Sequence, residues 1–176
     1  METPICLITG ASGGIGLATA LAMRDRGYAV RIVGRDPTKL AAAAAQLGAG
    51  VVAFRADFSS LAEVRQLAAD VLARDEPLHV LINNAGVWHP DFRLSRDGFE
   101  DVFAVNHLAP FLLTQLLLPR LRATRGDRRI VHVSSRLHLQ AGQATSIRGR
   151  VVHALNVVGV RVGGAAAASA SRSSEK

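Results

Sequence analysis

The chain alternates short apolar runs with longer stretches in which apolar residues recur at helical spacing. Short apolar runs bounded by glycine or polar turns are typical of strands buried on both faces. These runs are Ile5–Ile8, Ala29–Gly34, Val51–Phe54, Leu78–Ile82 and Arg129–Ser134. The helical spacing and its capping residues predict helices at Ile15–Arg26, Asp36–Gly48, Ser60–Arg74 and Gly98–Leu118. Strands that alternate with helices predict the α/β class, with a parallel sheet covered by helices on both faces.

The pattern changes near Gln140. Over residues 139–176 we find no amphipathic helix, although Val151–Val162 is rich in β-branched residues that suit a strand. Gly163–Ser174 consists almost entirely of glycine, alanine and serine, a composition typical of a flexible end. We therefore expect one folded domain at residues 1–138 and an atypical basic tail at residues 139–176.

Most of the positive charge belongs to this tail. The whole chain has 21 lysine and arginine residues against 14 acidic residues, a net charge of +7, and residues 136–176 contribute +5 of it. A basic chain often binds nucleic acid, but this segment contains no aromatic side chain that could stack on bases. We expect a solvated tail and no nucleic-acid partner.

Cysteine usage and apolar run length indicate the compartment. A single cysteine, Cys6, cannot form an internal disulfide and suits a reducing compartment. No basic segment of a secretory signal follows Met1, and charge or glycine interrupts each apolar run before it reaches the length of a membrane span. We expect a cytoplasmic protein without a spanning helix. The histidines show no metal-ligand spacing, so no metal is expected.

A glycine-rich loop, Thr9-Gly10-Ala11-Ser12-Gly13-Gly14-Ile15-Gly16, joins the first strand to the first helix. In that place Gly10 suits a tight turn, Gly14 the approach of a pyrophosphate, and Gly16 close packing of helix on sheet. The helix N-terminus adds unpaired N–H groups and the positive end of its dipole. This context favours a nucleotide site over a plain glycine-rich turn, and no Gly-Lys-Ser/Thr follows as in a Walker loop. The candidate cofactor-binding residues of the loop are Thr9, Gly10, Ser12, Gly14, Ile15 and Gly16.

Gly34-Arg35 ends the second strand, where dinucleotide-binding proteins recognise the adenosine ribose. An acidic residue there would accept a hydrogen bond from a 2′-hydroxyl, whereas the guanidinium of Arg35 suits a 2′-phosphate by charge and geometry. NADP is therefore favoured over NAD as the cofactor. The adjacent Asp36 weakens this distinction, and the alternative is that Arg35 is only a surface residue before the helix.

Further motifs, in order and spacing, resemble the short-chain dehydrogenase/reductase family over Met1 to about His138. The matching pieces are Thr9–Gly16, Asp57, Asn83-Asn84-Ala85-Gly86, Asn106 and Ile130–Ser135. The pieces that resemble the retinol-dehydrogenase-like branch in particular are Asp97–Glu100, Asn106–Thr114 and Ser134–His138. The resemblance implies an NAD(P)-binding, Rossmann-like, doubly wound parallel sheet with strand order 3-2-1-4-5. The family's later strands and helices would be missing, so that the sheet stops after the fifth strand.

The resemblance also implies a role for each matching residue. Asp57 would face the adenine. The residues that would line the nicotinamide-ribose side are Asn83, Ala85 and Gly86. Asn106 would hold a helix kink and a water of the proton relay, and Ser135, more than Ser134, would hydrogen-bond the substrate oxygen. The implied reaction is hydride transfer between NADP(H) and an alcohol or carbonyl substrate.

The family's catalytic Tyr-x-x-x-Lys pair has no counterpart in this sequence. A lysine four residues after the tyrosine lowers the tyrosine pKa for acid–base work, but the only tyrosine is Tyr28 and the lysines are Lys39 and Lys176. The narrow composition of the tail suggests a truncated or frameshifted product. Two alternatives to an active oxidoreductase stay open, a non-catalytic NADP(H)-binding module and an inactive, poorly folded fragment. The resemblance also implies a homo-oligomer, but the helix that forms the family's interface would be missing. Trp88 and Phe92 are candidates for an apolar substrate rim, and the alternative is that they only pack within the fold.

Overall fold

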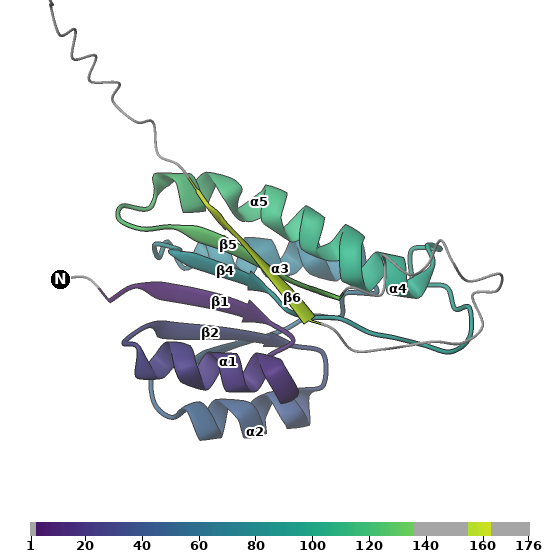
Figure 1. The fold of residues 1–176 in the computed structure, drawn as a ribbon, viewed down its shortest axis with the longest axis horizontal. Helices are drawn as coiled ribbons and strands as arrows, with labels where there is room; N and C mark the ends of the chain where they lie inside the picture. Colours follow the sequence, from purple (N-terminus) through teal and green to yellow (C-terminus); the bar gives the residue numbers. More distant parts are fainter. Residues whose placement is uncertain (1–2, 136–154, 163–176) are drawn as a thin grey trace, which may run out of the picture.

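The computed structural model describes residues 3–135 and 155–162. They form a six-stranded sheet with the order β3-β2-β1-β4-β5-β6 (Figure 1). The strands are β1 (Ile5–Thr9), β2 (Ala29–Gly34), β3 (Val52–Arg55), β4 (Val80–Asn83), β5 (Arg129–Ser135) and β6 (Leu155–Arg161). Neighbouring strands from β3 to β5 all pair in parallel, which confirms the predicted order 3-2-1-4-5.

Helices cover both faces of this sheet (Figure 1). The main helices are α1 (Gly14–Asp25), α2 (Pro37–Leu47), α3 (Leu61–Ala73) and α5 (Ala109–Ala123). The residues of β1 divide between two cores: Leu7 packs with α3 and α5, while Cys6 and Ile8 pack with α1 and α2. The strand β1 is apolar from Ile5 to Ile8 because both of its faces are buried.

The long helix before β5 begins at Asp101 instead of the predicted Gly98, because Gly98 adopts a φ of 80° in the preceding turn. Glu100 caps the helix, its carboxylate accepting hydrogen bonds from the N–H groups of the first turn. The helical run comprises α4 (Asp101–Phe103), the π-helical turn η1 (Ala104–Leu108) and α5. The π turn widens the helix around Asn106, and turns of this kind often occur at functional sites.

This helical run, Asp101–Ala123, is the one helix of the described residues that is long and apolar enough to cross a membrane by length and composition, with a mean hydropathy of 1.5. The sequence patterning predicts no such helix. Leu113, Leu117 and Leu121 are fully buried in the core with α3, and a helix packed in a protein core can be equally long and apolar. Packing in the core therefore accounts for these three leucines, and the absence of a membrane span stays a prediction.

β6 lies beyond β5 and runs antiparallel to it, with Ser135 opposite Leu155. It confirms the candidate strand within Val151–Val162 and extends the sheet past the fifth strand, where the sequence predicts that it stops. The reason is that a β-branched run can pair with the otherwise open edge of β5. The predicted boundary at residue 138 and the flexible end predicted at Gly163–Ser174 lie outside the described residues.

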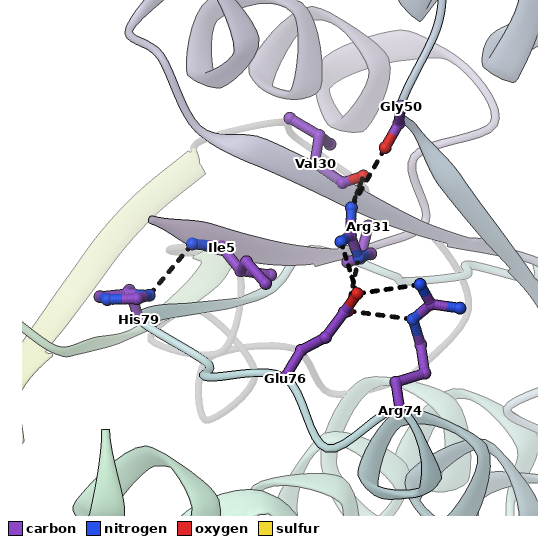
Figure 2. A network of polar contacts seen from close by, with 7 residues as sticks. All are labelled: Ile5, Val30, Arg31, Gly50, Arg74, Glu76 and His79. Atoms are coloured by element: carbon purple, nitrogen blue, oxygen red, sulfur yellow. Dashed lines mark hydrogen bonds and ion pairs between the residues drawn. The ribbon is translucent and has the colours of Figure 1, made fainter. Parts of the chain in front are cut away.

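A charged network ties the loops at the amino-terminal edge of the sheet to β2 (Figure 2). Arg31 of β2 donates to both carboxylate oxygens of Glu76, at 3.1 and 3.0 Å, and to the carbonyl oxygen of Gly50 at 3.2 Å. Arg74 donates to the same carboxylate at 3.0 and 2.9 Å. The hydrogen bonds from Arg74 and Arg31 lower the pKa of Glu76 to about 2. The charged side chain of Arg31 can therefore occupy a buried strand, because its N–H donors are satisfied by Glu76 and Gly50.

Candidate cofactor site

The glycine loop between β1 and α1 packs tightly against the end of β4. Gly10 has a φ of 67°, and a Cβ there would lie 2.8 Å from the Cα of Ala85. A Cβ on Gly16 would collide with the carbonyl oxygen of Gly10 and with Nδ2 of Asn84. Both positions therefore require glycine, and Gly16 packs as closely as its place in the motif predicts.

The N-terminus of α1 is open toward the same edge of the sheet. No side chain caps the helix at Gly13, and Cβ atoms built on Gly13 and Gly14 would have no neighbour within 4 Å. Ile15, in the first turn, is 49% exposed. The first N–H groups of the helix and the positive end of its dipole are thus left accessible, which suits a pyrophosphate.

Thr9 and Asn84 join the ends of β1 and β4. Thr9 Oγ1 accepts hydrogen bonds from the backbone N–H groups of Asn84 and Ala85, both at 3.0 Å. Asn84 Nδ2 donates to the carbonyl oxygen of Thr9 at 2.9 Å. Because Thr9 is fully buried, its side chain supports the two loops from beneath. The structural part played by Asn84 was not predicted from the sequence, since it depends on these two strands being neighbours.

Six of the predicted residues line one cavity of about 210 Å³ at the carboxyl edge of the sheet. They are Gly10, Ser12, Arg35, Asp57, Ala85 and Gly86. They come from the ends of β1, β2, β3 and β4, which are far apart in the sequence and adjacent in the fold. Ligands of open α/β sheets bind at this edge, and a guanidinium beside a carboxylate suits the adenosine part of NADP. The residues present therefore fit a nicotinamide dinucleotide.

Asn83 does not line this cavity, whereas the resemblance implies a place on the nicotinamide side. Its Nδ2 donates to Thr114 Oγ1 at 3.0 Å and lies 3.4 Å from Nδ1 of His132. Burial lowers the pKa of His132, and His107 lowers it further, which disfavours a charged ring beside this amide. Successive strand residues face opposite sides of a sheet, which directs Asn83 toward α5 and leaves Asn84 with the glycine loop.

Asp57 follows β3 and presents an ionised carboxylate to the cavity. Burial acts to raise its pKa, but hydrogen bonds from Ser59 and the positive charges of Arg96 and Arg35 outweigh burial and hold the pKa below its ordinary value. One of these bonds joins the Ser59 N–H to Asp57 Oδ1 at 3.0 Å. An ionised acceptor in this place suits the amino group of an adenine.

Asn106, in η1, holds the loop that follows β4. Its Oδ1 accepts from the Val87 N–H at 2.8 Å, and its Nδ2 donates to the Val87 carbonyl at 2.9 Å. Asn106 lies within the π turn, and the predicted helix kink and water at this residue stay predictions. His89 Nε2 lies 2.7 Å from Asp101 Oδ2 in the same loop. Trp88, which is 54% exposed, therefore lies between Val87 and His89, and both of these neighbours are held by hydrogen bonds to the helical run.

Ser135 and Tyr28 lie at opposite edges of the sheet. Ser135 is the last residue of β5, beyond the level at which Asn83 ends β4, so its backbone is at the carboxyl edge; its side chain is outside the described part. Tyr28 directly precedes β2 at the amino-terminal edge. Among residues 3–135 and 155–162, no cluster of three or more histidine, cysteine or acidic residues could hold a metal ion.

The sequence matches the short chain dehydrogenase family over residues 4–147. It is 42% identical over 147 residues to an uncharacterised oxidoreductase of Schizosaccharomyces pombe, which covers 78% of this chain and 43% of the relative. It is also 42% identical over 140 residues to retinol dehydrogenase 12 of Mus musculus, which covers 77% of this chain and 44% of the relative. The chain thus spans less than half the length of these curated relatives.

Solved structures with a nicotinamide cofactor share the fold. A metagenomic short-chain oxidoreductase in complex with NADP superposes with a TM-score of 0.62 at 30% identity, covering 70% of this chain and 58% of the other. A 3-ketoacyl-(acyl-carrier-protein) reductase from Brucella melitensis, complexed with NADH, superposes with a TM-score of 0.59 at 30% identity, covering 69% of this chain and 51% of the other. This fold is therefore compatible with either cofactor.

Proposed function

Because the chain belongs to the short-chain dehydrogenase family, we propose that it binds NADP(H) at the carboxyl edge of its sheet, as the cofactor-binding part of an oxidoreductase that acts on alcohols or carbonyls. The observation that carries the proposal is the single cavity lined by the glycine loop, Arg35 and Asp57. Each of these groups suits a different part of the cofactor, and the fold brings them together.

The parts of NADP(H) can be assigned to residues by charge and hydrogen-bonding capacity. The open N-terminus of α1 would hold the pyrophosphate. Arg35 would pair with the 2′-phosphate and Asp57 would accept from the adenine amino group. Ala85 and Gly86 are small enough to admit the nicotinamide ribose against the end of β4. Ser12, in the glycine loop, would donate a hydrogen bond to a phosphate or ribose oxygen.

The choice of NADP over NAD follows from Arg35. A guanidinium can form two charge-assisted hydrogen bonds with a phosphate, and NAD lacks the 2′-phosphate that would receive them. NAD is the less favoured cofactor for this reason, and it stays an alternative because the similar structures carry one or the other.

For the reaction, NADP(H) would supply or accept the hydride, and the chain would orient the substrate. Ser135, at the end of β5, would donate a hydrogen bond to the substrate oxygen. Asn106 would keep the loop after β4 in place through Val87 and hold a water near the substrate. Trp88 and Phe92, which are 54% and 75% exposed, would form an apolar rim for the carbon skeleton of a lipophilic alcohol or aldehyde. The similarity to a retinol dehydrogenase is consistent with that class.

A second candidate function is NADP(H) binding without turnover by this chain. The specific observation in its favour is the place of Tyr28, the only tyrosine, at the edge opposite the cavity. A phenol there cannot exchange a proton with a substrate at the carboxyl edge. The chain spans less than half the length of these relatives. Acid–base catalysis is therefore not assigned to any residue of this chain.

Binding and turnover assays on one preparation distinguish these functions. The 176-residue chain would be titrated with NADPH, followed by nicotinamide fluorescence, and then assayed with a panel of alcohols and carbonyls that includes retinol and retinal. Saturable binding with turnover supports the oxidoreductase, and binding without turnover supports the second candidate. A chain that is folded by circular dichroism and binds no NADPH would contradict both. Undiminished turnover by Ser135→Ala would remove that serine from the mechanism.

A further inference from the structure

The loop after β4 makes a second set of contacts at the adenosine end of the site. The backbone N–H of Arg96 donates to the carbonyl of Ser59 at 3.0 Å. The carboxylate of Asp97 accepts from the Leu61 N–H at 2.6 Å, in the first turn of α3. This part of the loop therefore rests on the segment that joins β3 to α3, beside Asp57.

The side chain of Arg96 joins two acidic residues there. Its terminal nitrogens lie 2.7 Å from Glu63 Oε1 and 3.5 Å from Asp57 Oδ2. The other oxygen of Glu63, Oε2, accepts from the backbone N–H of Asp57 at 2.9 Å. Arg96, Glu63 and Asp57 thus form a closed ring of contacts, and the backbone N–H of Glu63 donates to Ser60 Oγ, the N-cap of α3, at 3.4 Å.

The turn that presents Arg96 has its own internal hydrogen bonds. The Ser95 N–H donates to the Phe99 carbonyl at 2.8 Å, and Ser95 Oγ accepts from the Phe99 N–H at 3.2 Å. The Gly98 N–H donates to the Ser95 carbonyl at 3.1 Å. With Ser95 buried, the backbone of Arg96 belongs to a closed turn, which places the base of its side chain beside the segment that carries Asp57.

We propose that Arg96 is a positioning residue for adenosine recognition, which orients the carboxylate of Asp57 so that it can accept from the adenine amino group. The inference rests on the proposed function, in which Asp57 faces the adenine. The Ser59 N–H fixes one carboxylate oxygen and Arg96 attracts the other. We place Arg96 on Asp57 and not on the 2′-phosphate, because its terminal nitrogens face Glu63 and Asp57.

The test compares Arg96→Met, Arg96→Lys and a matched control, Arg93→Met, which removes an exposed arginine of the same loop. In the free protein, NMR titration would measure the pKa of the Asp57 carboxyl. We expect Arg96→Met to raise this pKa, Arg96→Lys to raise it less, and Arg93→Met to leave it unchanged. Melting temperatures of the three variants would report any loss of folding.

Calorimetric titrations would then compare cofactors. Arg96 is 59% exposed, so its ion pair with Asp57 is of modest strength. We expect Arg96→Met to weaken the binding of NADP and of NAD by the same factor, about threefold. Nicotinamide mononucleotide, which has no adenine, should bind unchanged. In an Asp57→Asn background, Arg96→Met should cost no further affinity, because its effect passes through Asp57.

Three results would overturn the inference. One is an Asp57 pKa that does not respond to Arg96→Met. Another is a loss restricted to NADP, which would place Arg96 on the 2′-phosphate. The third is a full additional loss in the Asp57→Asn background. If the wild-type chain binds neither NADP nor NAD, the proposed function fails, and the titration of Asp57 in the free protein still decides whether Arg96 acts on that carboxylate.

Discussion

Arg35 is the residue on which the choice between NADP and NAD depends. Replacing it by alanine removes a charge-assisted pairing with a 2′-phosphate, worth about 1.5 to 3 kcal/mol. We expect Arg35→Ala to weaken NADPH by about tenfold or more, with little change for NADH. Calorimetric titration with both cofactors would measure this, with Arg65→Ala on the exposed face of α3 as the control. Equal losses for NADPH and NADH would remove Arg35 from the choice.

Glu76 makes the free energy of unfolding depend on pH. Its pKa is lowered from 4.5 to about 2, first by Arg74 and then by Arg31. The ionised form is therefore favoured by folding, so its stabilisation is complete above about pH 4.5 and disappears as the pH falls toward 2. We expect Glu76→Gln to lower the free energy of unfolding by about 1 to 2 kcal/mol at neutral pH, after allowance for solvent screening.

Urea unfolding of both proteins as a function of pH would check this expectation. The difference in unfolding free energy between wild type and Glu76→Gln should shrink as the pH falls below about 4.5. Asp25→Asn removes an acid whose side chain is 64% exposed, in an ion pair with Arg24, and should change stability little. A Glu76→Gln difference that is constant down to acid pH would show that the charge of Glu76 is not the cause.

Local motifs predict some of these residues and not others. Gly10, Arg35 and Asp57 were predicted because each occupies a fixed place next to a strand end, and the structure brings all three to one cavity. Arg96 was not predicted, since its partner Glu63 is 33 residues away in the sequence. Asn83 and Asn84 are adjacent, and only strand alternation in the folded sheet separates their contacts.

The fit of α1 against the glycine loop depends on a single missing side chain. A Cβ on Gly16 would meet the backbone of Gly10 and Asn84 Nδ2, so Gly16→Ala must move the helix or the loop. We expect a loss of about 1 to 3 kcal/mol in stability and weaker binding of NADPH, because the helix N-terminus would shift. Thermal unfolding and fluorescence titration of the same variant would measure both effects.

Gly13→Ala is the matched control for this prediction. Gly13 has an extended φ of 175°, which any residue adopts, and a Cβ there would have no neighbour within 4 Å. Gly13→Ala should therefore leave the melting temperature nearly unchanged. If Gly16→Ala is as stable as Gly13→Ala and binds NADPH equally well, the close packing of α1 does not shape the site.

The sequence predicted best those elements whose burial is uniform along their length. β1 was predicted because Ile5–Ile8 is an unbroken apolar run, as expected for a strand covered on both faces. The start of the long helix was misplaced, since the helical spacing continues through the turn at Gly98 and cannot show its positive φ. β6 was only a candidate, because a β-branched run becomes a strand when an edge such as that of β5 is open to it.

At the scale of the whole molecule, the two ends of the parallel strands carry different groups. The carboxyl edge carries the glycine loop, Arg35, Asp57 and the end of β5, whereas the amino-terminal edge carries Tyr28 and the network around Glu76. The strand order was predictable because the motifs came in family order, and the family fixes how the strands cross over. The residues that carry out hydride transfer are harder to predict, because the chain spans only 43% of one curated relative and 44% of another.

The most direct test of the account is to map NADPH on the folded chain by NMR, following the backbone amides of a labelled sample during titration. We predict saturable shifts at Gly10, Ser12, Arg35, Asp57 and Gly86, around the cavity at the carboxyl edge. Tyr28, at the opposite edge, should not shift. Shifts that centre on the amino-terminal edge, or a well-dispersed spectrum that NADPH leaves unchanged, would contradict the claim that this sheet edge binds the cofactor.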